Sequence, residues 1–158
     1  MPEQVDLGEV RAWIADRPFM TWMGIAVVTL EPRNVVLSLN IEPHMRYIQG
    51  MLHGGLACVL LDTAIGVAAR LEVPADRAVR TTALETHYLA PGRGSLARVV
   101  GTATLADDGS GNRVVGTGTV SIDGIDVASG RGEFAVVYRD RNLREAHGRE
   151  SRRSVAGG

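Results

Sequence analysis

The longest apolar stretch of this chain spans residues 52–71 and reads LHGGLACVLLDTAIGVAARL. From Leu56 onward it is apolar nearly all round a helical wheel, so a helix over 56–71 has no solvent face and must be covered by other elements. The apolar run itself, residues 56–71, is too short to span a bilayer, and Asp62 and Thr63 interrupt it. We therefore predict a buried central helix.

The segments around this helix have the period-two pattern of β-strands. Two short strands at 23–30 and 35–41, joined by turn residues, predict a hairpin before the helix. Gly130 and Gly132 in the last strand indicate a bulge or a close approach of another element. The strands predicted after the helix form a four-stranded meander at 79–89, 95–105, 113–122 and 125–138. An antiparallel sheet that covers an apolar helix curls around it, which makes an α+β domain.

The two ends of the chain differ from this central part. Residues 7–16 have the apolar spacing of a short amphipathic helix, which Pro18 ends. We assign residues 1–138 to a single domain, because 158 residues are too few for two. The tail 139–158 holds six arginines and three acids with almost no apolar residues, and we predict that it is disordered and solvated.

Composition excludes several classes of function. All 17 basic residues are arginine, so the chain has no lysine for a Schiff base or a phosphate-binding loop. The formal net charge of −1 gives no field that favours nucleic acid or a membrane as a partner. One cysteine and no paired histidine or acid spacing predict no metal site. The N-terminal residues lack a signal-peptide pattern, so we expect a cytoplasmic protein.

The motif that carries chemistry is His53-Gly54-Gly55, followed by Asp62. Two glycines at the start of a helix leave backbone N–H groups unpaired, and these groups with the helix dipole can stabilise an oxyanion. Asp62 is a carboxylate among apolar neighbours, so it must face a polar partner or a cavity. A carboxylate in such a place is a candidate base or nucleophile.

The spacing of these groups limits how they can act together. Gly54 and Asp62 lie eight residues apart, which is roughly 12 Å along a helix. This separation is too long for both groups of one helix to act on the same carbonyl. We therefore predict a two-fold dimer in which the glycine end of one subunit's helix faces the aspartate of the other.

About residues 20–138 resemble the hotdog-fold acyl-CoA thioesterases, of the type that includes the phenylacetate-degradation and 4-hydroxybenzoyl-CoA thioesterases. The matching segments are Leu52-His53-Gly54-Gly55, Leu61-Asp62-Thr63-Ala64 and Thr81-Thr82 leading to Tyr88-Leu89-Ala90-Pro91. The resemblance implies a hotdog fold and an acyl-CoA or acyl-carrier thioester as substrate. Coenzyme A is then part of the substrate and no separate cofactor is expected. It also implies self-association as a homodimer or homotetramer, with sites at the interface.

The resemblance gives each residue of the motif a role. The Gly54 N–H polarises the thioester carbonyl, and Asp62 of the other subunit acts as general base on water or as nucleophile. Thr81 lies near the water. His53 either contacts the thioester region or is a structural histidine bonded to the backbone.

The remaining predicted site residues are less closely matched. Tyr47 stands where the family usually has Asn or Gln to orient water or substrate, and Gln49 is its candidate replacement. Arginines are expected near the phosphates of coenzyme A. The other predicted substrate contacts are Gly55, Thr82, Arg93 and Arg131.

We predict an acyl-CoA thioesterase from this pattern, with two alternatives. Tyr47 in place of the amide residue leaves open a non-hydrolytic protein that binds or senses acyl-CoA. A hotdog dehydratase or hydratase, in which a histidine and an acid act on a β-hydroxyacyl thioester, fits the spacing of His53 and Asp62 less well.

Overall fold

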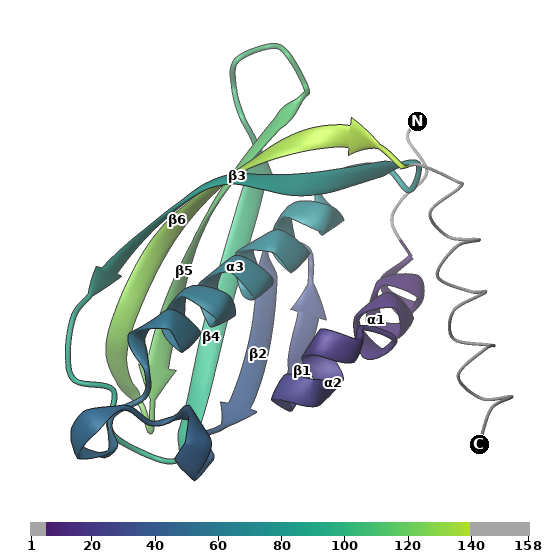
Figure 1. Cartoon of the computed structure of the whole chain (residues 1–158). Coiled ribbons are helices and arrows are strands. Elements are labelled where there is room, and N and C mark those ends of the chain that lie inside the picture. Colours follow the sequence, from purple (N-terminus) through teal and green to yellow (C-terminus); the bar gives the residue numbers. More distant parts are fainter. Residues whose placement is uncertain (1–5, 140–158) are drawn as a thin grey trace, which may run out of the picture.

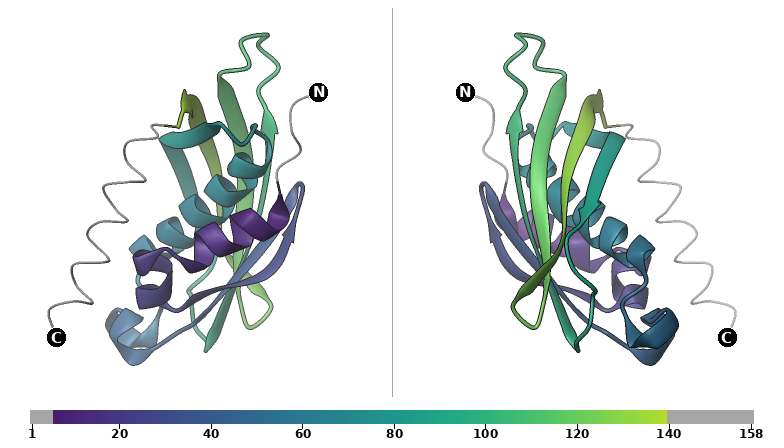
Figure 2. Two further views of the ribbon diagram at one scale, coloured as in Figure 1. Left: turned by 90° about the vertical axis from the view of Figure 1, so that its right-hand side faces the viewer. Right: turned by 90° about the vertical axis from the view of Figure 1, so that its left-hand side faces the viewer.

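The structure, a computed structural model, describes residues 6–139. Six antiparallel strands form one sheet that curves around the long helix α3, Gly54–Leu71 (Figure 1). Two short helices, α1 (Leu7–Ala15) and α2 (Pro18–Met23), lie on the same side of the sheet as α3 (Figure 2). The predicted α+β class, an antiparallel sheet around a central apolar helix, is confirmed.

The order of strands in the sheet is β1-β2-β4-β5-β6-β3. The bounds of the strands are β1 Ile25–Glu31, β2 Asn34–Asn40, β3 Arg77–Tyr88, β4 Leu96–Leu105, β5 Arg113–Ile122 and β6 Ile125–Tyr138. The predicted hairpin is present, since β1 pairs with β2. The predicted four-stranded meander is wrong, because β3 pairs with β6 and only β4, β5 and β6 follow one another.

The segment between β3 and β4 explains this order. Strand β3 follows α3 in the chain and forms the edge of the sheet opposite β1. Residues 89–95 then run back across the end of the sheet. Leu89 donates to the Val127 carbonyl of β6, and Ser95 accepts from the Ile41 N–H just after β2. Strand patterns identify strands but not their partners, so this crossing was not visible in the sequence.

Element boundaries also differ near the N-terminus. Pro18 does more than follow the first helix, because it begins α2, where a proline is favoured at the first helical position. Gly24 ends α2 in the left-handed conformation with φ of 73°. The first strand therefore starts at Ile25 rather than at 23. Two short 3-10 helices, η1 (Pro43–Met45) and η2 (Ile48–Gly50), lie between β2 and α3.

Glycines on the inner face of the sheet let α3 approach closely. A Cβ atom on Gly101 would lie 2.5 Å from the backbone carbonyl carbon of Ala64, and one on Gly116 would lie 2.5 Å from Cγ2 of Ile65. Three further glycines face Leu61 or Ile65 in the same way: Gly118, Gly130 and Gly132. The close approach predicted for the last two is confirmed.

One face of α3 is less covered than the sequence predicts. Among the described residues α3 is the one helix long and apolar enough to cross a membrane, with mean hydropathy 1.5, and half of it is buried within the fold. The expectation of a helix with no exposed face is wrong for a single subunit, since Cys58, Asp62 and Gly66 are only half-buried. The sheet covers one side of the helix, and apolar composition does not say what covers the other.

The domain assignment of residues 1–138 stays a prediction. Helix α1 occupies the place of the helix predicted at 7–16. The predicted tail, from residue 140 onward, lies outside the described residues.

We expect Gly116→Ala to destabilise the fold by about 1 to 3 kcal/mol, since the new methyl group would overlap the Thr102 carbonyl oxygen and Ile65. Thr117→Ala is the matched control, because Thr117 is the next residue and is exposed on the opposite face. Urea unfolding of both variants measures the difference. Equal loss in the two variants would show that the glycine face is not what admits α3.

Candidate active site

Asp62 lies in the middle of α3 and is held by the neighbouring edge strand. Its Oδ1 atom accepts a hydrogen bond of 2.8 Å from Thr81 Oγ1 of β3. None of residues 6–139 donates a hydrogen bond to its other oxygen, Oδ2. The structure thus brings together two predicted site residues, and it leaves one carboxylate oxygen available to a water molecule or a ligand.

A cavity of about 320 Å³ adjoins this pair. Asp62 and Thr81 line it from α3 and β3, and Phe134 of β6 lines it from the sheet. The rest of its lining is mostly apolar and comes largely from α1 and α2, including Trp13 and Phe19. A cavity of this size, largely apolar with a few polar groups, is typical of a small-molecule site.

The part of this cavity that α1 and α2 contribute was not predicted from the sequence. Helical spacing places Trp13 on α1, but it cannot say that α1 and α2 lie beside the middle of α3. The one available signal was composition: aromatic residues make only 4% of the chain, yet three of them lie within residues 13–22, namely Trp13, Phe19 and Trp22.

The N-terminal end of α3 carries the second candidate group. His53 is the N-cap residue, and its Nδ1 accepts a 3.0 Å hydrogen bond from the Gly55 N–H. Within the described part of the chain the Gly54 N–H has no hydrogen-bond partner. Gly54 is therefore the free donor at this helix end, while the Gly55 N–H is satisfied internally and His53 has a structural role in holding it.

Tyr88 of β3 covers the same helix end. Its hydroxyl donates a 2.9 Å hydrogen bond to the Gly54 carbonyl oxygen and lies 3.3 Å from Cys58 Sγ. The contact with Cys58, followed by burial, raises the pKa of Tyr88. A Cβ atom on Gly54 would lie 3.2 Å from the Tyr88 hydroxyl, so this position has little room for a side chain. The sequence motif contained Tyr88 but gave it no role.

Tyr47, Gln49 and Arg93 gather beside His53. The Tyr47 ring meets the His53 ring edge-on, with 5.6 Å between their centroids. Arg93 donates a 2.6 Å hydrogen bond to the Gln49 carbonyl oxygen, and its second amino group lies 3.4 Å from Gln49 Oε1. The candidate replacement for the missing amide is therefore bonded to the arginine predicted to bind phosphate. This cluster lies at the glycine end of α3, away from Asp62 of the same chain.

The sequence model of one protein family, described as "Domain of unknown function (DUF4442)", matches residues 10–137. This chain belongs to the DUF4442 family. The chain is also 30% identical over 141 residues to the Halobacterium salinarum protein named "Putative esterase VNG_1336C". That match covers 83% of this chain and 91% of the relative.

Solved structures of thioesterase-superfamily proteins have the same fold as this DUF4442 domain. A thioesterase family protein from Silicibacter pomeroyi aligns with a TM-score of 0.75 at 24% identity, over 83% of this chain and 97% of that chain. A thioesterase from Haemophilus influenzae aligns with 0.73 at 16% identity, over 87% and 94%. The BH2602 protein from Bacillus halodurans, solved with CoA, aligns with 0.67 at 29% identity, over 85% and 94%. The predicted hotdog fold is confirmed.

Thr82 and Arg131, two of the predicted substrate contacts, do not lie in the site with Asp62. Thr82 donates a 3.0 Å hydrogen bond to the Glu133 carbonyl oxygen, because a β-bulge between Thr81 and Ala83 shifts the register of β3 on β6. Arg131 lies on the outer face of the sheet and pairs with Glu133 at 2.7 Å. Alternation along β6 places Arg131 on the opposite face from Gly130 and Gly132, which face α3.

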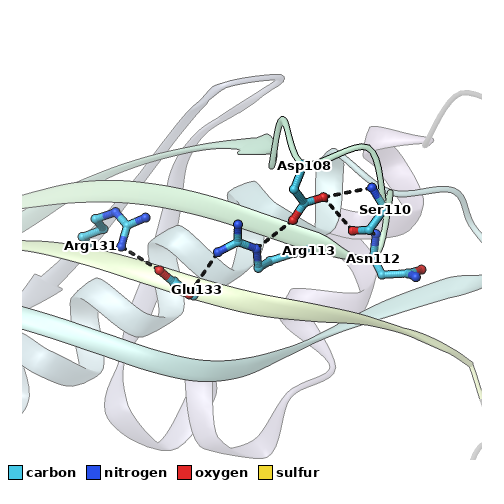
Figure 3. Close-up of polar contacts among 6 residues, drawn as sticks. All are labelled: Asp108, Ser110, Asn112, Arg113, Arg131 and Glu133. Atoms are coloured by element: carbon cyan, nitrogen blue, oxygen red, sulfur yellow. Dashed lines mark hydrogen bonds and ion pairs between the residues drawn. The ribbon is translucent and has the colours of Figure 1, made fainter.

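Arg131 belongs to a chain of alternating charges on this outer face (Figure 3). Glu133 lies between Arg131 and Arg113, and Arg113 reaches Asp108 in the β4–β5 loop at 3.1 Å. Two hydrogen bonds from Ser110, followed by one from Arg113, lower the pKa of Asp108 to about 2. Arg131 therefore has a structural partner already.

Among the described residues no cluster of three or more histidine, cysteine or acidic side chains could hold a metal ion.

We expect this network to make stability depend on acid pH. The folded pKa of Asp108 lies below its ordinary 3.8, so its contribution is present above about pH 4 and is lost as the pH falls towards 2. Asp108→Asn should therefore lose less thermal stability than the parent protein between about pH 5 and about pH 2. Asp107→Asn, which removes the adjacent exposed acid, is the control. Parallel melting curves of Asp108→Asn and parent across this range would contradict the assignment.

Proposed function

We propose that this DUF4442 domain is an acyl-CoA thioesterase in which Asp62 is the general base or nucleophile. The observation that carries the proposal is a carboxylate held by Thr81 in the wall of a largely apolar cavity. The esterase name of the Halobacterium relative and the CoA in the Bacillus halodurans structure support the choice of thioester class.

The general-base route follows from the geometry at Asp62. The Thr81 hydrogen bond fixes the carboxylate, and Oδ2 can accept a proton from a water molecule. The resulting hydroxide attacks the thioester carbon, while the Gly54 N–H of a second subunit stabilises the oxyanion. When the carbon–sulfur bond breaks, the proton passes to the departing thiolate, so the products are a carboxylic acid and coenzyme A. In the nucleophile route Asp62 attacks the thioester carbon, the carbon–sulfur bond breaks and the coenzyme A thiolate leaves. Water then hydrolyses the resulting anhydride, which releases the carboxylic acid and regenerates Asp62.

A two-fold dimer is part of this proposal. Gly54 and Asp62 belong to one helix and lie roughly 12 Å apart along it, so they cannot serve the same carbonyl. Strand β3 is a 12-residue edge strand that is exposed at Thr81 and Ala83, with a row of backbone groups open on one side. Antiparallel pairing of two β3 strands would satisfy these groups and bring the two α3 helices side by side in opposite directions.

We expect Asp62→Asn to reduce thioester hydrolysis by about 10²- to 10⁴-fold, because the amide cannot accept the proton. The change keeps the size of the side chain, so the protein should still fold and bind substrate. Hydrolysis is followed by release of the free thiol from a panel of acyl-CoA substrates. Asp126→Asn, which removes an exposed acid of β6, is the control and should retain full activity.

Two results would contradict the proposal. Hydrolysis by Asp62→Asn at the parent rate would remove Asp62 from the mechanism. Tight binding of acyl-CoA by the parent protein without turnover of any substrate would instead favour a non-hydrolytic binding protein, the alternative to which Tyr47 points.

A further inference from the structure

Two charged side chains line the cavity: Asp62 and Arg17. Arg17 is the N-cap residue of α2, and it is solvent-exposed while also lining the cavity. Its Cζ atom lies 4.2 Å from the centroid of the Trp13 ring. This cation–π contact gives the guanidinium a fixed place in the cavity wall.

The guanidinium of Arg17 has no polar partner among the described residues, since no side chain or carbonyl accepts a hydrogen bond from it. Burial lowers the pKa of Arg17 below its ordinary value, and the nearby charge of Asp16 opposes part of this lowering. An arginine remains protonated across the working pH range and carries five N–H donors in a planar fork. Contact with one ring face of Trp13 leaves these in-plane donors available to a ligand.

Most of the remaining side chains that line the cavity are apolar. Ile14 and Met20 come from α1 and α2, Val67 comes from α3, and Phe134 comes from β6. Such a lining fits a short hydrocarbon chain. A molecule whose reacting carbonyl lies at Asp62 and whose chain follows this lining can present its far end to Arg17, the other charged group of the cavity wall.

We propose that the acyl group carries a carboxylate at the end remote from the thioester, and that Arg17 binds this carboxylate. The inference rests on the proposed function and names its substrate class: a thioester of a dicarboxylic acid with a short apolar chain. The planar fork of arginine matches a carboxylate with two parallel hydrogen bonds. The phosphates of coenzyme A are a poorer match, because they lie on the sulfur side of the thioester, beyond the long pantetheine arm.

Matched substrate pairs test the inference, because the two members differ only at the remote end of the acyl group. The pairs are butyryl-CoA with succinyl-CoA, hexanoyl-CoA with adipyl-CoA, and octanoyl-CoA with suberyl-CoA. We expect the parent protein to have the higher kcat/KM for the carboxylated member of at least one pair. Arg17→Gln should lower that ratio roughly 10- to 100-fold, the effect of losing hydrogen bonds between charged groups. Arg17→Lys, which keeps the charge but not the fork, should fall between the two.

Arg11→Gln is the matched control, because it removes an exposed arginine of α1 outside the cavity lining and should leave the ratio unchanged. Equal losses on both members of every pair in Arg17→Gln would overturn the inference and assign the guanidinium to the phosphates of coenzyme A or to folding. A parent protein with no preference for any carboxylated member would also overturn it.

Binding separates failure of this inference from failure of the proposed function. If the parent protein hydrolyses no member of any pair, the proposed function fails. Calorimetric titration of the pairs into the Asp62→Asn protein then still tests Arg17. Tighter binding of a carboxylated member that is lost when Arg17→Gln is added supports the inference, and equal binding of both members in every pair overturns it.

Discussion

The close packing of α3 against glycines on the inner face of the sheet is the constraint on which the rest of this structure depends. Gly101, Gly116 and Gly118 remove the Cβ atoms that would hold the helix away from the strands. The helix can therefore lie deep in the curved sheet, and its other face is left for function. Asp62 lies on that half-buried face, within hydrogen-bond distance of Thr81.

A rigid helix also separates the two groups that the proposed reaction needs. The free Gly54 N–H lies at the first turn, where His53 caps the helix and Tyr88 covers it, whereas Asp62 lies two turns further on. No bending of α3 brings them together without breaking its packing on the glycines. The open edge at β3 offers a way to complete the site with a second copy, and the same edge strand supplies Thr81 to the carboxylate.

Much of this arrangement could be predicted from the sequence, and the features that could not be predicted share a physical reason. Apolar periodicity predicts α3 and the strands, and a lone carboxylate in an apolar helix predicts that Asp62 faces a polar partner or a cavity. Periodicity reports which face a residue occupies but not which element lies opposite. It therefore does not predict the pairing of β3 with β6. Arg131 was predicted as a substrate contact because coenzyme A carries phosphates, but it lies on the outer face of the sheet. The cavity wall from α1 and α2 depends on packing between distant segments, which a single sequence does not encode locally.

The most direct test of the composite site mixes two inactive variants, Asp62→Asn and Gly54→Pro, under conditions that exchange subunits. Proline is favoured at the first helical position and removes the Gly54 N–H. Gly54→Ala is the matched control, because it brings the same Cβ atom against Tyr88 and keeps the N–H. If each site joins Asp62 of one subunit to Gly54 of the other, half of the dimers are mixed and each has one intact site. Since half of the dimers then have one of their two sites intact, we expect about a quarter of the parent activity after exchange. Activity no higher than that of the separate variants, with exchange shown to be complete, would contradict it.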